Sequence, residues 1–394
     1  MRKFISNLVG MLLGALAILP PFCDDIRLFN IKYAQHSSWG IEIPVVVNSF
    51  AWVYAVIFIG LLISYFWFCD INLTVKLFSS YVYLTCFFSA APYISFNAML
   101  LLVPAFYMYL LVKKLVDKDI IINWIVALFW FEVAIGILQF FGRDVLMNFN
   151  RPQSIFLGTI MQHMRYGSLF AILTPFLLLK SRWYIIPLIV CAFLTYSSSF
   201  ALALFAGIFV YICLTKIKYK VLVLSAIIIL SVGHSFYNHG SFQTATSIGR
   251  IPVWKRIVWT GAGAHFSASK ISAIESPIDS TIHIFKGRGL NHFTYLYPVM
   301  VEDANPFAQC HNDWLQIWWE LGLIGLLLCY VYCSGIIKRL YHRKDHIWIV
   351  GLVVIMVNMF FAFPVYMPPQ TPLILLCFLA LCEAQTRSKD VVQT

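Results

Sequence analysis

The chain has 394 residues, of which 61% are hydrophobic and only 11% are charged. Soluble domains carry about 25% charged residues, so the composition excludes an ordinary soluble protein. The formal net charge of +11 is typical of nucleic-acid binding. Most of the basic residues, however, lie in short loops between apolar runs, which argues against that function.

Apolar runs of about 20 residues recur from end to end, and each is long enough to cross a hydrocarbon core of ~30 Å. They predict an all-α polytopic membrane protein with a single membrane domain over residues 1–394. The first run follows Arg2 and Lys3, as in a signal peptide, but no small-residue cleavage site follows, so we interpret it as a retained span. In chain order, the twelve predicted spans are residues 4–22, 44–68, 73–91, 93–112, 120–141, 164–179, 183–196, 199–215, 219–236, 314–337, 347–363 and 371–384.

Basic residues in short loops indicate how a membrane protein is oriented. The segments "KIKYK" (216–220) and "KRLYHRK" (338–344) fall on the same side of the predicted spans, which we assign to the cytoplasm. The even number of spans then predicts that both termini are cytoplasmic. Two longer loops, residues 142–163 and 237–313, fall on the opposite face, and the longer one joins the ninth and tenth spans.

The large outer loop contains two recognisable segments. In "SIGRIPVWKRIVWTGAGAHF" (247–266), helical spacing of Ile251, Trp254, Ile257 and Val258 among basic residues predicts an amphipathic helix at the membrane interface. In "KGRGLNHF" (286–293), glycines flank Arg288 and predict a turn whose backbone approaches a ligand closely.

Basic side chains concentrate in these outer loops, whereas several other outer loops have none. Arginine is favoured where a phosphate is held by two hydrogen bonds. A nucleotide is not expected outside the membrane, so an anionic lipid headgroup or a lipid-linked diphosphate is the predicted partner. The alternative is that these residues only contact phospholipid headgroups. The group comprises Arg151, Arg165, Arg250, Lys255, Arg256 and Arg288.

No metal site and no cofactor are predicted. The ten cysteines form no CxxC pair, and no Asp-x-Asp motif lies on an outer loop. Asp24 and Asp25 are adjacent and too close to a span to form a convincing metal pair. Cys23 and Cys310 both fall on the outer side, but single cysteines do not specify a disulfide framework.

The stretch "HNDWLQIWWELGLIG" (311–325) places polar residues where the long loop enters the tenth span. His311 is a candidate general base, because a histidine titrates near neutral pH. The alternative is that Asn312 or Asp313 caps the helix and that His311 is incidental. Glu320 lies nine residues beyond His311, which places it on roughly the opposite face.

Two further features of the spans are open at this stage. Gln316 shares the face of Glu320, and Gly322 with Gly325 is expected to allow close contact between helices. Glu132, inside the fifth span, is either a packing contact with Gln139 or a functional acid, because ionisable groups are rare at such depth.

Five stretches, in this order, resemble the O-antigen ligase/polymerase family of bacterial envelope glycosyltransferases. Together they cover about residues 150–325. Family members often have Ser-Arg at the start of the eighth span, where this chain has Ser198-Ser199-Phe200, and Arg165 is our candidate to supply that arginine. The stretches are "RPQSIF" (151–156), "SSSFALALFAGIFVYI" (197–212), "GRIPVWKR" (249–256), "GRGLNHF" (287–293) and "HNDWLQIWWELGLIG" (311–325).

The resemblance implies a C-type glycosyltransferase architecture in the bacterial inner membrane, with the active site facing the periplasm. It implies an inverting, metal-independent ligase that transfers a glycan from undecaprenyl-diphosphate to lipid A–core oligosaccharide. The alternatives are an O-antigen polymerase, a protein O-oligosaccharyltransferase and, from a different class, a flippase for lipid-linked glycans. In the ligase interpretation His311 is the base, and the substrate-binding residues are Arg250, Arg288, Arg151, Arg165, Arg256 and Asn312.

Overall fold

The computed structural model describes residues 2–18, 51–69, 71–89, 92–141, 163–195, 197–215, 254–255, 257–258, 277–290, 292–293, 310, 312–362 and 370–387. Within these ranges the chain forms helices and turns and contains no strand, which confirms the all-α prediction. The helices are α1 (Arg2–Ile18), α3 (Ala51–Phe68), α4 (Leu73–Phe87), α5 (Pro92–Leu115), α6 (Lys118–Phe140), α7 (His163–Lys180), the 3-10 helix η2 (Arg182–Tyr184), α8 (Ile185–Leu194), α9 (Ser198–Leu214), α14 (Pro277–Lys286), α16 (Asp313–His342), α17 (His346–Phe361) and α18 (Gln370–Arg387).

The predicted spans coincide closely with these helices, because each apolar run ends where polar or turn-forming residues begin. The ninth predicted span, residues 219–236, lies outside the described residues, as do most of the two outer loops. The number of twelve spans therefore stays a prediction. By length and composition, α6 and α16 can cross a membrane, and most of the other described helices are shorter apolar segments.

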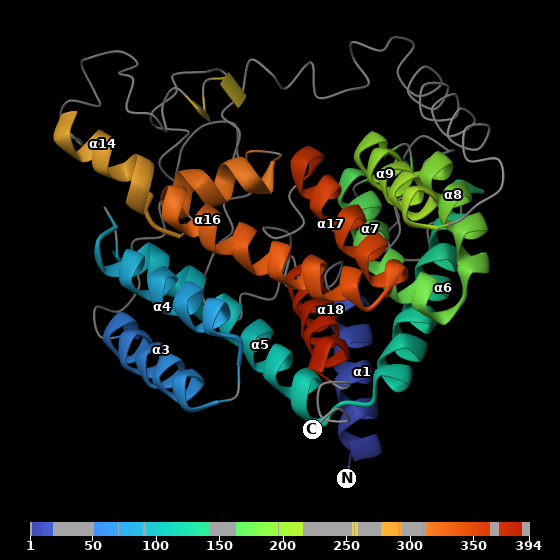
Figure 1. Cartoon of the computed structure of the whole chain (residues 1–394), viewed down its shortest axis with the longest axis horizontal. Helices are drawn as coiled ribbons and strands as arrows, with labels where there is room; N and C mark the ends of the chain where they lie inside the picture. The colour runs from blue at the N-terminus through green and yellow to red at the C-terminus, as the bar shows by residue number, and fades with distance from the viewer. Residues whose placement is uncertain are drawn as a thin grey trace.

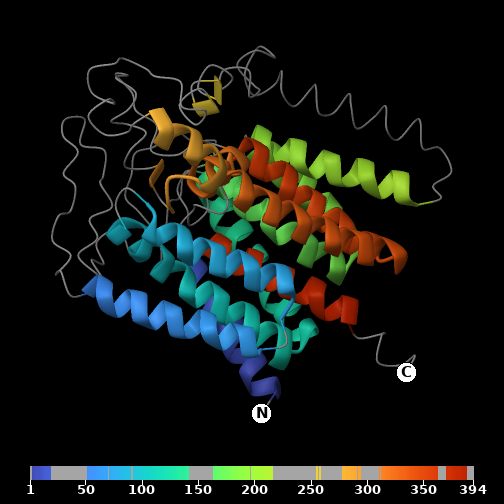
Figure 2. The same cartoon turned by 60° about the vertical axis from the view of Figure 1, so that its left-hand side comes forward.

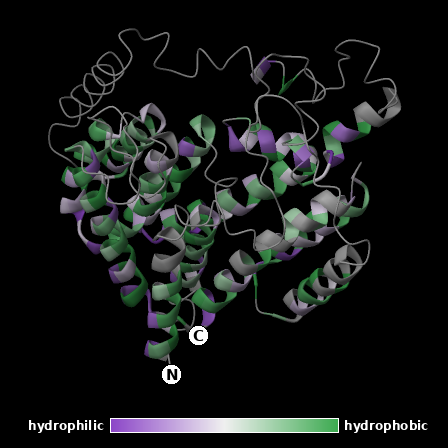
Figure 3. Cartoon of the chain, turned by 180° about the vertical axis from the view of Figure 1, so that it is seen from behind, coloured by the Kyte–Doolittle hydropathy of each residue, from purple (hydrophilic) through white to green (hydrophobic). Residues whose placement is uncertain are grey.

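The surface of the helices is itself apolar. Phe4, Leu61, Phe141, Trp183 and Tyr330 each have more than half of their surface exposed. Figure 3 shows hydrophobic residues along much of the length of the helices, with many of the hydrophilic ones near helix ends. Soluble proteins rarely expose apolar area on this scale, so the surface fits a hydrocarbon environment. The chain is accordingly a membrane protein.

The helices form two groups, and α1, α16 and α18 each contact both. One group contains α3, α4 and α5, and the other contains α6, α7, α8, α9 and α17 (Figures 1 and 2). α16 contacts α4 on one side and α17 on the other. α17 packs closely on α7 and α9, because Gly351 allows contact with Pro175 and Gly207 allows contact with Val354. The start of α1 and the end of α18 lie at the same end of the molecule (Figure 1).

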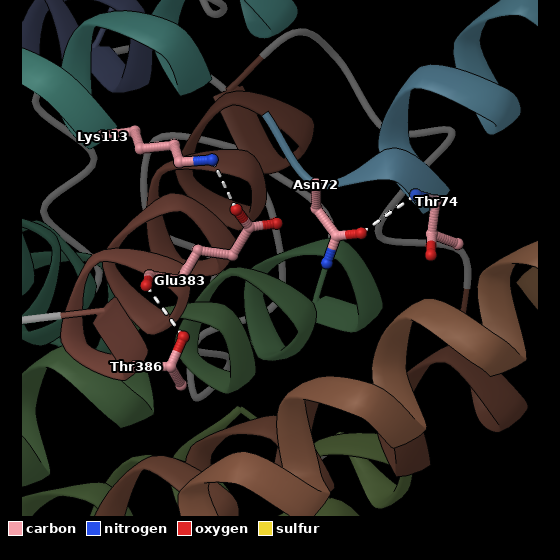
Figure 4. A network of polar contacts seen from close by, with 5 residues as sticks. All are labelled: Asn72, Thr74, Lys113, Glu383 and Thr386. Atoms are coloured by element: carbon pink, nitrogen blue, oxygen red, sulfur yellow. Dashed lines mark hydrogen bonds and ion pairs between the residues drawn. The ribbon is translucent and has the colours of Figure 1, made fainter. Parts of the chain in front are cut away.

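A buried ion pair joins α5 to α18. Lys113 Nζ lies 2.7 Å from Glu383 Oε2, and the two side chains are only 5% and 2% exposed (Figure 4). Thr386 Oγ1 donates to the Glu383 carbonyl oxygen at 2.8 Å. In the predicted orientation, this pair lies toward the cytoplasm, away from the outer loops.

Candidate active site at the start of α16

Asn312 is the N-cap of α16. Its backbone is extended, with φ −159° and ψ 103°, and its Oδ1 accepts a hydrogen bond from the Leu315 N–H at 3.0 Å. This contact satisfies one of the amide donors that the first turn of a helix leaves unpaired. Of the two cap candidates, Asn312 is therefore the one that caps. His311, the residue before the cap, lies outside the described residues, and its role stays a prediction.

α16 is broken at Gly322. The backbone there has φ 66° and ψ −174°, a conformation that only glycine adopts without strain. A Cβ atom at Gly322 would overlap the carbonyl oxygen of Phe285, and one at Gly287 would overlap the carbonyl oxygen of Glu320. The two glycines thus allow the backbone of the turn after α14 to pack directly against the backbone at the break. The expected close contact at Gly322 exists, but with a loop and not with another helix.

The turn satisfies the carbonyl groups at the break. The last four carbonyls of a helical segment have no donor within it. The Arg288 N–H donates to the Trp319 carbonyl at 3.3 Å, and the Gly289 N–H donates to the Glu320 carbonyl at 2.9 Å. Tyr81 of α4 places its hydroxyl 2.9 Å from the Leu321 carbonyl oxygen. The break and the turn are therefore one hydrogen-bonded unit, anchored to α4.

Arg288 is held inside this unit. Its side chain is 1% exposed, and its guanidinium carbon lies 4.6 Å from the centre of the Trp319 ring. Such stacking is favourable and becomes stronger when the cation is shielded from water. The contact fixes the direction of the guanidinium group close to the start of α16.

Gln316 and Glu320 form the polar interior of the site, and both are fully buried. Gln316 Nε2 donates to Glu320 Oε1 at 3.1 Å, as their shared face predicts. The same Glu320 oxygen accepts from the Phe293 N–H at 3.3 Å, while Gln316 Oε1 accepts from the Cys310 N–H at 3.3 Å. No role for Glu320 was predicted from the sequence. In the structure, its carboxylate and Gln316 hold loop backbone.

The predicted amphipathic segment packs against this part of α16. Residues 254–255 and 257–258 are helical, and Ile257 is completely buried in a cluster with Phe293, Cys310 and Trp319. Trp254 Nε1 donates to the Cys310 carbonyl at 3.2 Å. The helical spacing is confirmed here, but Ile257 faces protein and not lipid. The Cys310 thiol is free, so no disulfide joins it to Cys23.

Two buried histidines hold the turn from its other side. His292 Nδ1 lies 3.1 Å from Ser95 Oγ at the start of α5, and His283 Nδ1 lies 2.9 Å from the Gly287 carbonyl oxygen. Burial lowers the pKa of His292 from 6.5 to about 4, so this side chain is neutral at neutral pH. His292 serves to dock the turn on α5.

Residues 183–330 match the family model described as O-antigen ligase. This segment of the chain is similar to the O-antigen ligase family. The match confirms the resemblance found in the sequence, and it runs from η2 through the Arg288 turn to the middle of α16. No match was found among curated proteins.

Within the O-antigen ligase segment, α9 begins at the N-cap Ser197, whose Oγ accepts from the Phe200 N–H at 3.4 Å. A Cβ atom at Gly167 would overlap the Ser197 side chain, so the start of α7 packs on the start of α9. Arg165 lies two residues before Gly167, on the first turn of α7. Its backbone therefore lies near the start of α9.

Only some of the other predicted site residues lie within the part of the chain that the structure describes. Arg288 stacks on Trp319 of α16 and Asn312 caps the same helix, whereas Arg151, Arg250, Arg256 and His311 lie outside the described residues. Among the described residues, no group of three His, Cys, Asp or Glu side chains is arranged to hold a metal ion.

The sequence interpretation missed α14, although its signals were present. Pro277 occupies the first helical position and Gly287 follows the last one, which is the usual asymmetry of helix ends. It also missed Tyr81 and Ser95, for which no local signal exists.

Proposed function

We propose that this protein is an O-antigen ligase of the bacterial inner membrane. It takes a glycan from an undecaprenyl-diphosphate carrier and joins it to the lipid A–core oligosaccharide on the periplasmic face. The observation that carries the proposal is the docking of the Arg288 turn on the broken start of α16 within a segment that is similar to the O-antigen ligase family. That docking brings a buried, oriented arginine close to the helix start that follows His311.

The proposed reaction is a single displacement. The acceptor hydroxyl attacks the anomeric carbon of the donor, and His311 accepts the proton of that hydroxyl. The bond between the anomeric carbon and the diphosphate oxygen breaks, and the lipid diphosphate leaves with the electron pair. Attack opposite the leaving group inverts the anomeric centre. No metal ion takes part in this scheme.

The departing diphosphate requires positive charge aimed at its oxygens. In the proposal, guanidinium groups from both outer loops supply it, and Arg288 is the one whose direction is fixed by stacking. Asn312 lies next to the base and assists the substrate through its amide nitrogen, since its Oδ1 caps α16. The arginines that act with Arg288 are Arg151, Arg165, Arg250 and Arg256.

The function is tested with purified protein, lipid-linked donor and core acceptor. Glycan transfer to the core in the absence of any partner protein supports the ligase. Growth of the glycan on its carrier indicates a polymerase, transfer to a protein indicates a protein O-oligosaccharyltransferase, and no covalent product indicates transport.

Two variants test the assigned roles in the same assay. His311→Ala is expected to insert normally and to lose transfer. Arg288→Lys is expected to use the donor poorly even though it keeps the charge, because lysine lacks the planar fork and the Trp319 stack.

A further inference from the structure

Gln316 and Glu320 connect the two ends of one loop segment. Glu320 accepts from the Phe293 N–H, and Gln316 accepts from the Cys310 N–H. These two amides lie immediately before and after residues 294–309 along the chain. Because the two side chains are also bonded to each other, one polar pair on α16 fixes both ends of that segment.

The same pair constrains the backbone next to His311. Cys310, the preceding residue, is held at its N–H by Gln316 and at its carbonyl by Trp254. Asn312, the following residue, is held by its place at the N-cap. His311 therefore stands between two residues whose backbones are fixed, and Gln316 contributes to one of these two restraints.

A carboxylate is a costly means of holding loop backbone at this position. An ionisable side chain within a membrane helix costs roughly 2.5 kcal/mol or more. Glu320 and Gln316 accept hydrogen bonds from loop amides near the site. This direction of bonding favours a role in the reaction.

We propose that Gln316 and Glu320 act together as positioning residues, which fix the backbone on both sides of residues 294–309 and thereby orient His311. The inference rests on the proposed function, in which His311 is the base. Neither side chain needs to touch the substrate. The pair acts through the backbone of Cys310 and Phe293.

Kinetics of the leucine variants test the proposal. Gln316→Leu and Glu320→Leu are each expected to lower kcat by about 10- to 100-fold, because small displacements of a reacting group are costly. The KM for the lipid-linked donor should change by less than about threefold, since the arginines that hold the donor remain. The double variant should lose no more than the worse single variant, because the two residues act as one unit.

Conservative substitution separates positioning from charge. Glu320→Gln is expected to keep kcat within about fivefold of the parent, because the amide oxygen still accepts from both donors. Gln139→Leu removes a buried glutamine from a different helix, α6, and serves as the matched control. It should leave kcat and KM unchanged within about twofold. A full additive loss in the double variant, or a Glu320→Gln variant as inactive as Glu320→Leu, overturns the proposal.

Alkylation of Cys310 reports on the same bond without any turnover. The thiol is buried, and burial together with the nearby Asp313 raises its pKa, so maleimide should modify it slowly in the parent protein. Gln316→Leu should accelerate its modification by about tenfold, measured by mass spectrometry of the peptide that contains Cys310. His311→Ala and Gln139→Leu should leave it slow.

The two arms distinguish the failure of this inference from failure of the proposed function. Parent-like kcat in Gln316→Leu beside an inactive His311→Ala overturns the positioning role alone. Full transfer by His311→Ala overturns the base assignment, whatever the Gln316 variants do. Loss of kcat in Gln316→Leu without faster alkylation of Cys310 also overturns the positioning role, because the backbone of Cys310 would then not have moved.

Discussion

Replacing Gly322 with alanine is expected to undock the Arg288 turn from α16. The alanine Cβ would overlap the Phe285 carbonyl oxygen, so either the turn or the helix break must move. The backbone conformation at φ 66° and ψ −174° adds strain for any residue with a Cβ.

The magnitude follows from the contacts at the break. The strained conformation costs about 1–3 kcal/mol, and losing the Arg288 and Gly289 amide bonds costs about 1 kcal/mol each, which gives about 3–5 kcal/mol against the docked state. Since 1.4 kcal/mol is roughly a tenfold change, the docked population relative to the undocked one falls by at least about 100-fold.

Two measurements follow this change. Hydrogen exchange at the amides of Arg288 and Gly289 should become faster, and the rate of glycan transfer should fall by at least about tenfold. Gly335→Ala is the matched control, because Gly335 lies in the regular part of the same helix and a Cβ there would meet only the Arg339 side chain at 3.8 Å. Parent-like exchange and transfer in Gly322→Ala would refute the reasoning.

Three further predictions concern the surrounding structure. Asn312→Ala should destabilise the start of α16 by about 1 kcal/mol, seen as a lower thermal midpoint in detergent that Asn312→Asp restores. Glu383→Gln should destabilise the protein by about 3–5 kcal/mol by removing the carboxylate that balances the buried Lys113 charge, whereas adding Lys113→Met should recover most of that loss; equal midpoints for the single and double variants would contradict this. The pKa of His292 is lowered to about 4 in the docked turn, so the undocked state binds more protons between pH 6.5 and 4. The docked state therefore becomes less stable as the pH falls through that window, and the loss is at most about 3 kcal/mol. Hydrogen exchange at Arg288 should therefore accelerate on acidification, and His292→Gln should flatten that dependence.

The helices were predictable because apolar runs of membrane length carry their own signal. The ranges 73–91, 120–141 and 347–363 agree with α4, α6 and α17 to within a few residues. The cap at Asn312 was one of two alternatives that the local sequence left open, and the hydrogen bond to the Leu315 N–H decides between them. Local patterns determine where helices begin and end because capping and hydrophobic periodicity act over a few neighbouring residues.

The partners of the motif residues were not predictable in the same way. Gly322 was expected to serve helix contact, yet it receives the turn at Gly287, 35 positions earlier in the chain. Glu320 accepts a hydrogen bond locally from Gln316, and it also accepts one from the Phe293 amide, which joins two distant segments. Tyr81 comes from still farther away.

The sequence by itself determined that this is a helical membrane protein, where most of its helices lie, and which family its segment 183–330 resembles. These properties follow from composition, from periodicity and from ordered motifs, all of which are written along the chain. Only the tertiary structure decided that the Arg288 turn and the break at Gly322 form one unit and that Gln316 and Glu320 hold the loop ends. The physical reason is that these contacts are backbone hydrogen bonds between distant segments, which depend on the path of the chain and not on the identity of neighbouring residues.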